Sequence, residues 1–325
     1  MYHDGKHICM LKTIPPRPCR RPLEGWFRRR WCNLRSSMLA CPWYYSSKLF
    51  LRSEYGIDKE RERQLNSKWW MIMHPYSAMR FYWDCFSTIV YVFSLLYLPL
   101  QVFIICPNRH DPYILFTDAV GFLAIGFNFV TGCVVEDGKK IGLEPVEIAR
   151  RYIKDNFVFD VISALPLQCV ALDDDCNFPT YTVLYLLKLF RVTPVANVIR
   201  KLGHQFRLPY LTLVLVTVCL HILVFYHWMT FCHYQVPLYY KYVYPEPNFK
   251  LDDWLRRVKA MSVDNEHINL LEKYIINLYY VTGLCIGAGV FSLVEPNSQI
   301  PEQQVVNACV GIIGLLFMTY TFTSK

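Results

Sequence analysis

Six apolar segments recur along the chain, and they constrain its fold more than any other feature. A helix needs roughly 20 predominantly apolar residues to cross the hydrocarbon core of a bilayer. The segments near this length are 81–105, 113–130, 152–172, 181–202, 208–231 and 305–322. Hydrophobic residues make up 54% of the chain and charged residues 18%, which is too apolar for a typical soluble protein. The sequence therefore predicts an all-α integral membrane protein with six transmembrane helices.

Loop charge predicts how these segments are oriented. Residues 1–70 contain 15 Lys and Arg against 6 Asp and Glu, whereas the remainder is close to neutral. The loop 134–154 is also basic, and the acidic loop 173–175 has no Lys or Arg. Because basic loops stay on the cytoplasmic side, both termini are predicted to be cytoplasmic. The basic N-terminal part is expected to face anionic membrane lipid rather than nucleic acid.

The residues before the first apolar segment fall into two parts. Residues 1–45 combine prolines with arginine clusters, a composition that resists a packed core, so a disordered basic N-terminus is predicted. Residues 46–73 contain a charged helical run and the pair Trp69-Trp70, which is typical of an amphipathic element at a membrane interface. This second part is predicted to be a cytosolic helical domain that precedes the first span.

The stretch 273–296 has the layout of a re-entrant pore loop. It begins as an apolar helix too short to cross a bilayer, continues into Cys285-Ile286-Gly287-Ala288-Gly289, and ends in polar residues. Irregular backbone at membrane depth is tolerated only where it lines a cavity, and its carbonyls can then replace the hydration shell of a cation. Taken alone, Gly-x-Gly also fits a helix-packing glycine pair, but the flanking spans favour a selectivity filter at residues 285–289.

Basic residues recur at intervals of three in the fourth apolar segment. Lys188, Arg191 and Arg200 lie on this row and Lys201 adjoins it, whereas Pro194 and Asn197 leave its centre uncharged. Such a row becomes straight if the helix tightens to three residues per turn. Charge at membrane depth is costly and responds to the membrane potential, which predicts a voltage sensor. The alternative is that Lys188 and Arg200 extend to opposite interfaces.

A buried row of cations requires carboxylates on neighbouring helices. The candidates are Asp118 in the second span and Asp160 in the third, although either could instead lie at an interface. Glu295, beyond the glycine-rich stretch, is a candidate for an acidic ring at the outer mouth of a pore. A solvated loop carboxylate is the alternative for that residue.

Short motifs follow one another in a fixed order from about Ser46 onward. They are HPYSAMRFYWD (74–84), GFNFVTGCVVEDG (126–138), YIKDNFVFDVISALP (152–166), IRKLGHQF (199–206), HW (227–228) and LCIGAG (284–289). In this order and at these spacings they resemble the hyperpolarisation-activated, cyclic-nucleotide-gated cation channels. The resemblance implies a non-swapped tetramer that passes potassium and sodium through a central pore. It also implies a voltage-sensor-like domain at 74–207 and a pore domain at 208–325.

The resemblance also assigns roles to single residues. Carried over by position, residues 285–289 would be the selectivity filter, Asp118 and Asp160 the acidic partners of the sensor, and Gly314 the flexible glycine of the pore-lining sixth span. It further implies that the segment before the first span packs against the sensor.

Four departures from the family pattern bear on these roles. Ala288 replaces the filter tyrosine, the sensor row is depleted, Ala124 occupies a second-span position that is acidic in the family, and the resemblance stops with the chain at Lys325. We therefore expect shallow voltage dependence, and no cofactor or cyclic-nucleotide site within this chain. No metal is expected beyond the permeant potassium and sodium ions.

Two functions remain open from the sequence. The first is a pore-forming subunit of a voltage-dependent monovalent cation channel in the plasma membrane, assembled as a homo- or hetero-tetramer with related subunits. The second is a non-conducting regulatory subunit, which Ala288 motivates. An enzyme or transporter is disfavoured because no catalytic motif and no inverted repeat is visible.

Overall fold

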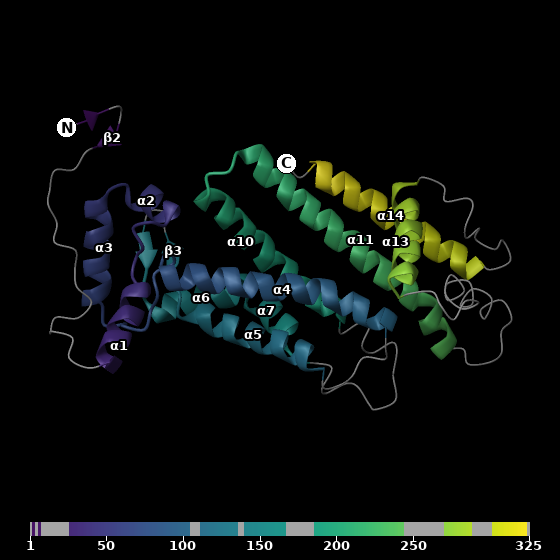
Figure 1. The fold of residues 1–325 in the computed structure, drawn as a ribbon, viewed down its shortest axis with the longest axis horizontal. Helices are drawn as coiled ribbons and strands as arrows, with labels where there is room; N and C mark the ends of the chain where they lie inside the picture. The colour runs from purple at the N-terminus through teal and green to yellow at the C-terminus, as the bar shows by residue number, and fades with distance from the viewer. Residues whose placement is uncertain are drawn as a thin grey trace. The chain divides into compact units, whose positions relative to one another are not determined.

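The computed structural model describes residues 2–3, 6–7, 26–104, 111–135, 140–166, 185–243, 270–287 and 301–323. These residues are mostly helical (Figure 1), which confirms the all-α prediction. Two short antiparallel strand pairs accompany the helices: β1 (Tyr2–His3) with β2 (Lys6–His7), and β3 (Cys133–Val135) with β4 (Lys140–Gly142).

Four helices among the described residues are long and apolar enough to cross a membrane. They are α4 (Ala78–Ile104), α5 (Pro112–Phe129), α11 (Tyr210–Val243) and α14 (Pro301–Thr323). They correspond to the first, second, fifth and sixth predicted segments. The third and fourth segments are described only in part, because residues 167–184 lie outside the described ranges.

The chain divides into two compact units. The first unit contains Met1–Tyr91, Thr117–Leu165 and Phe190–Leu213, and the second contains Val92–Phe116, Pro166–Leu189 and Val214–Lys325. Helices α4, α5 and α11 each run from one unit into the other, so this division is discontinuous in sequence. The contiguous boundaries predicted at 74–207 and 208–325 stay a prediction.

The first unit starts with three helices, α1 (Trp26–Ser37), α2 (Tyr45–Leu51) and α3 (Glu54–Asn66). The Ser53 side chain caps α3 by accepting a hydrogen bond from the backbone N–H of Gly56 at 3.0 Å. The cytosolic helical segment predicted at 46–73 thus matches α2 and α3.

The prediction of disorder for residues 1–45 is wrong over residues 26–45. Helix α1 is ordered, and Leu39 and Ala40 after it are each 1% exposed. The reason is tertiary: the Met38 carbonyl accepts hydrogen bonds from the backbone N–H of His74 at 3.0 Å and from Gln64 Nε2 at 3.1 Å. These contacts hold the segment against residues far along the chain, which composition alone does not reveal. Most of residues 1–25 lie outside the described ranges.

The third predicted span begins later than the sequence indicated. Helix α6 (Pro145–Asp155) ends at Asn156, and a separate helix α7 (Phe157–Ala164) follows. Asn156 has φ −126° and ψ −11°, which breaks the helical path. The last turns of α6 contain three basic residues, which favours leaving α6 outside the hydrocarbon, so the apolar part starts at Phe157 rather than Tyr152.

The fourth segment tightens at the start of its charged row. Residues Lys188–Arg191 form a 3₁₀ helix, η1, which continues as α10 (Val192–Gln205). A 3₁₀ helix places residues three apart directly above one another. The predicted straightening of the row is therefore present between Lys188 and Arg191.

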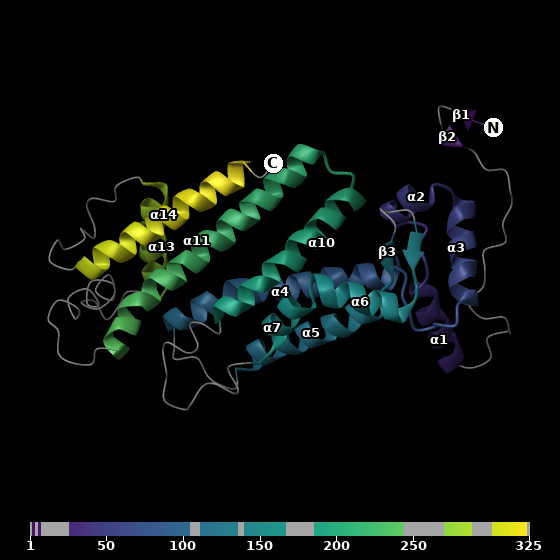
Figure 2. The same cartoon turned by 180° about the vertical axis from the view of Figure 1, so that it is seen from behind.

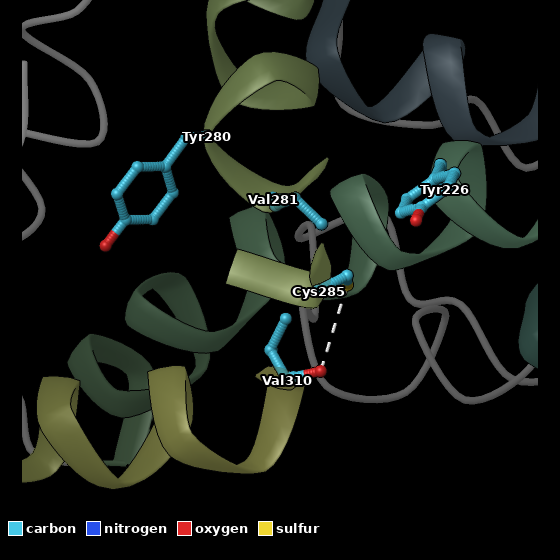
Figure 3. Close-up of a cluster of buried hydrophobic side chains, with 5 residues drawn as sticks. All are labelled: Tyr226, Tyr280, Val281, Cys285 and Val310. Atoms are coloured by element: carbon cyan, nitrogen blue, oxygen red, sulfur yellow. Dashed lines mark hydrogen bonds between the residues drawn. The ribbon is translucent and has the colours of Figure 1, made fainter. Parts of the chain in front are cut away.

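The second unit is built around the short helix α13 (Leu270–Ile286). The two views place α13 against α11 and α14 (Figures 1 and 2). Its buried core comprises Tyr226, Tyr280, Val281, Cys285 and Val310, drawn in Figure 3. The aromatic rings of Phe225 and Phe317 stack beside this core with centroids 3.8 Å apart.

Candidate functional site

A buried arginine lies at the centre of the first unit. Arg191 Nη2 lies 2.5 Å from Asp118 Oδ1 on α5 and donates to the Ser163 carbonyl of α7 at 2.9 Å. Its Nη1 donates to Thr117 Oγ1 at 3.1 Å, and its guanidinium lies 5.5 Å from the ring centre of Tyr91 on α4. Three helices, α4, α5 and α7, therefore contact the guanidinium that η1 carries.

Burial makes this arrangement a charge centre rather than a surface ion pair. The Arg191 side chain is 1% exposed and that of Asp118 is 2% exposed. Desolvation of two charges is offset only where the pair has good geometry and further hydrogen bonds, and Arg191 has both. The structure thus brings together Arg191 and Asp118, as the sequence predicted for a sensor cation and its acidic partner.

A second ion-pair cluster joins the first turns of α4 to the second half of α10. The sequence predicts that these parts of the two helices lie toward the cytoplasm. Asp84 on α4 binds Arg80 Nε at 2.7 Å and Lys201 Nζ at 2.9 Å. The Arg80 guanidinium also donates to Thr131 Oγ1 at 3.0 Å. Sequence reasoning missed Asp84 as the partner of Lys201. The available signal was a carboxylate four residues after Arg80, at the start of an apolar helix.

Asp160 does not take the predicted place beside the basic row. Its carboxylate accepts hydrogen bonds from Tyr152 Oη at 2.7 Å and from Asn128 Nδ2 at 3.2 Å. Its hydrogen-bond partners among the described residues are thus neutral, so the expected ion pair between Asp160 and the basic row is corrected. The reason is position: the break at Asn156 places Asp160 within one turn of the start of α7.

A cavity of about 740 Å³ opens between the helices of the first unit. Arg200 lines it and donates to Asn197 Oδ1 at 2.7 Å. The other charged residues lining it are Arg80, Asp84, Asp160 and Lys201. Ala124 also lines the cavity, so the missing second-span carboxylate leaves its basic residues with less opposing charge. Lys188 is buried at 1% exposure.

The N-terminal helices contact the end of the basic helix. Gln205 Oε1, in the last turn of α10, accepts a hydrogen bond from the backbone N–H of Tyr45 at 2.7 Å. Just beyond, the Arg207 guanidinium lies 4.9 Å from the Tyr45 ring centre. The packing of the pre-span segment against the sensor, which the family resemblance implied, is present.

In the second unit, the helical part of the pore loop extends further than the sequence indicated. Cys285 and Ile286, expected in the irregular filter stretch, form the last turn of α13. Gly287 follows with φ +72°, a left-handed conformation that glycine adopts without strain. The structure thus corrects the position of Cys285 and Ile286. Ala288, Gly289 and Glu295 lie outside the described residues.

Gly314 of α14 packs directly against Cys285 of α13. A Cβ atom built at Gly314 would lie 2.5 Å from the Cβ of Cys285 and 2.6 Å from its Cα. The Cys285 Sγ also contacts the Val310 carbonyl at 3.8 Å, as Figure 3 shows. Gly314 therefore permits close helix packing behind the end of α13, and its expected role as a flexible hinge stays a prediction.

Polar groups of α11 connect the other elements of the second unit. His227 Nε2 donates to the Leu96 carbonyl of α4 at 3.0 Å, because a carbonyl only accepts. His227 Nδ1 is then left to accept from Tyr274 Oη of α13 at 2.6 Å. Trp228 Nε1 donates to the Leu95 carbonyl at 3.0 Å. The HW motif thus connects α11 to both α4 and α13.

A second buried histidine, His233, lies on the same helix, α11. Its ring lies 5.2 Å from that of Tyr280, whose hydroxyl accepts a hydrogen bond from Asn307 Nδ2 at 2.8 Å. Within the described ranges, no cluster of three or more metal-ligating side chains is found. This histidine therefore packs among aromatic and amide groups of α13 and α14.

Comparison with known proteins agrees with this architecture. The potassium/sodium hyperpolarization-activated cyclic nucleotide-gated channel 1 of Homo sapiens is 37% identical over 123 residues, which are 37% of this chain and 14% of that channel. Channel 4 of the same kind from Rattus norvegicus is 35% identical over 123 residues, 37% of this chain and 10% of that channel. The chain is related to the hyperpolarisation-activated, cyclic-nucleotide-gated channels. No family model matches it.

This relationship to hyperpolarisation-activated channels confirms the resemblance carried by the motifs. Together with the four apolar helices, it identifies a multi-pass membrane protein. The match covers about a seventh or less of the curated relatives' length. The activity, permeant ions and assembly of the whole channels therefore come to this chain only as proposals.

Proposed function

We propose that the chain is a pore-forming subunit of a tetrameric, voltage-dependent channel for monovalent cations in the plasma membrane, with both termini in the cytoplasm. The observation that carries the proposal is α13. Its 17 residues extend about 25 Å, short of the roughly 30 Å hydrocarbon core. It lies between two full-length spans and ends at a left-handed glycine, the layout of a pore helix that leads into a carbonyl-lined filter.

The permeant ions are proposed to be potassium and sodium, in line with the printed names of the relatives. Close packing of Gly314 against Cys285 supports a filter that begins at this point, because the packing fixes the backbone from which the filter would start. A rigidly positioned ring of carbonyls, one set from each subunit, would take the place of ion hydration.

Voltage dependence is proposed to arise from Arg191. This charge lies between helices of the first unit and is paired with Asp118. Moving one elementary charge across the membrane field changes the free energy by about 2.3 kcal/mol for about every 100 mV. Because the row contains few cations, we expect a shallow response.

Whole-cell recording with voltage steps tests the proposal. Cells expressing the wild type should carry a monovalent cation current, and Ala288→Tyr should change the potassium-to-sodium permeability ratio. Arg191→Gln should shift or flatten the voltage dependence without altering that ratio. Absence of current from both the wild type and Ala288→Tyr, despite surface expression, would contradict a pore-forming role.

A non-conducting regulatory subunit is the second candidate, and Ala288 is the observation that favours it. Silence of the wild type together with current in Ala288→Tyr would select this function. Co-expression with a related channel should then alter the amplitude or gating of that channel's current. An unchanged partner current would eliminate the regulatory role.

A further inference from the structure

Helix α1 presents its apolar stripe to solvent. Phe27, Trp31 and Leu34 recur at helical spacing and are 83%, 50% and 44% exposed. Cys32 and Arg35, on another face of the helix, are buried. In a soluble domain the apolar stripe of an amphipathic helix faces the core. Helix α1 is turned the opposite way, so these large apolar side chains are exposed.

The exposed stripe continues onto a neighbouring segment. The ring of Trp31 lies 5.4 Å from that of Trp70, centre to centre. Trp69 and Met71, on either side of Trp70, are 50% and 55% exposed. We define the aromatic patch as Trp26, Phe27, Trp31, Leu34, Trp69, Trp70 and Met71. Apolar patches of this kind on a folded surface mark interaction sites.

The aromatic patch is bordered by positive charge. Helix α1 contains four arginines and no acidic residue, and Arg29 and Arg30 are exposed. The Arg30 guanidinium lies 5.2 Å from the ring centre of Trp26. Exposed Lys68 directly precedes the second part of the patch. Tryptophan and phenylalanine beside arginine are typical of helices that lie in the headgroup region of a membrane.

The chain also keeps the aromatic patch near a bilayer. Six residues, 72–77, separate Met71 from Ala78, the first residue of the apolar helix α4. Even a fully extended chain of this length reaches only about 25 Å. An element attached so closely to a span, and basic as cytoplasmic segments are, meets the inner lipid surface without a long linker.

We propose that the aromatic patch, with Arg29 and Arg30, binds the anionic phospholipid surface of the membrane that α4 spans. The tryptophan rings enter the headgroup region and the guanidinium groups pair with lipid phosphate and carboxylate groups. This anchor holds the N-terminal helices, and through the Tyr45–Gln205 contact the end of α10, against the bilayer. The anchor does not depend on whether the chain conducts ions.

Hydrogen exchange of the full chain in nanodiscs tests the anchor. Discs of phosphatidylcholine are compared with discs that also contain phosphatidylserine, each at low and high salt. The backbone amides of α1 should exchange about tenfold more slowly in the anionic discs at low salt, because lipid attraction of juxtamembrane cations is electrostatic and screened by salt. Arg29→Glu with Arg30→Glu should abolish this difference.

Matched variants separate the aromatic contribution from general damage. Trp26→Ala with Phe27→Ala should lose the lipid-dependent protection, whereas Tyr55→Ala, which removes an exposed aromatic ring of α3 outside the patch, should keep it. Exchange of α3 and α4 in the same samples reports whether each variant is folded. Quenching of tryptophan fluorescence by brominated lipid should fall in Trp26→Phe with Trp31→Phe.

Two results would overturn the proposal. One is α1 exchange that is the same in neutral and anionic discs, with brominated-lipid quenching unchanged by the tryptophan substitutions. The other is protection of α1 that ignores lipid composition but rises with the number of chains per disc. The latter result would assign the aromatic patch to contact with a second copy.

Discussion

The two units of this protein stabilise their interiors by different chemistry. In the first unit a guanidinium, a carboxylate and a carbonyl meet out of contact with water at Arg191, Asp118 and Ser163. The core around α13 in the second unit instead uses aromatic rings, a thiol and a glycine contact too close for any side chain. A buried charge responds to an electric field, whereas close packing fixes a backbone. The contrast is the one expected if the proposed sensing role belongs to the first unit and the proposed conduction role to the second.

The comparison makes its largest prediction at Asp118. Replacing Asp118 with Asn leaves the Arg191 charge buried without its counter-charge, which costs about 3–5 kcal/mol of unfolding free energy. The thermal unfolding midpoint of the purified chain in detergent or nanodiscs measures this loss. The matched control is Asp160→Asn, which should cost less because the partners of Asp160 are neutral.

A double substitution shows whether charge is the cause. Asp118→Asn combined with Arg191→Gln should be more stable than the sum of the single effects predicts, with a coupling of about 0.5–3 kcal/mol. Additive losses would mean that the first unit depends on shape at this position, as the second unit does, and the contrast would fail.

Close packing in the second unit is tested by two glycines on one helix. Gly314→Ala should destabilise the chain by about 1–3 kcal/mol, because the new methyl group overlaps the backbone and side chain of Cys285. Gly311→Ala should be neutral or stabilising by up to about 1 kcal/mol. A Cβ atom there has its nearest neighbour, the Leu284 carbonyl, at 3.5 Å, and alanine favours helix. Thermal unfolding that gave both variants the same sign would refute the packing argument.

A buried histidine in the first unit, His74, should make the stability of the folded chain depend on pH. Burial, with the nearby Arg63 charge, lowers the pKa of His74 from its ordinary 6.5 to about 3. Its Nδ1 accepts from the backbone N–H of Tyr76 at 3.1 Å, so the neutral ring is part of the fold. Below pH 6.5 the unfolded chain binds a proton that the folded chain does not, so stability falls as the pH drops toward 3, by up to about 1.4 kcal/mol for each pH unit.

Thermal unfolding at pH 7.5 and pH 5.5 measures this effect of His74. In His74→Gln the amide can still accept from Tyr76, but it does not titrate. The variant should therefore lose less stability than the wild type between these two pH values. An identical loss in both proteins would place the pH response elsewhere in the chain.

The smallest effect is expected at Lys201. Its side chain is 49% exposed although it lies 2.9 Å from Asp84, and solvent-screened pairs contribute only about 0.2–1 kcal/mol. Lys201→Gln should therefore lower the unfolding free energy by less than about 1 kcal/mol, since Asp84 keeps Arg80 as a partner. A loss as large as that of Asp118→Asn would mean that the whole basic row is shielded from water.

Much of the fold follows from local sequence patterns. The length of an apolar run is a property of consecutive residues, so the spans at α4, α5 and α14 were predictable within a few residues. Helix α11 begins close to its predicted start but continues to Val243, beyond the predicted end at residue 231. The same predictability holds for the presence of the short helix α13, although not for its end at Ile286, and for the charge interval of three in the fourth segment. These features needed no knowledge of the neighbouring helices.

Partner choice was decided only by the tertiary structure. Asp118 and Asp160 were equal candidates in the sequence, yet only Asp118 reaches Arg191. Pairing depends on the depth and rotation of two helices relative to each other, and a single helix pattern contains neither. For the same reason Asp84 was overlooked, and Gly314 gained a packing role that spacing did not reveal.

The order of α1 is the clearest case of a tertiary decision. The arginines of α1 and the prolines that precede it predicted disorder, because a segment of this composition has few apolar residues to bury. Hydrogen bonds from His74 and Gln64 to the Met38 carbonyl supply the missing stabilisation from more than 20 residues away. The sequence by itself therefore determined which segments can enter a membrane, and the tertiary structure decided which charges, glycines and aromatic faces meet.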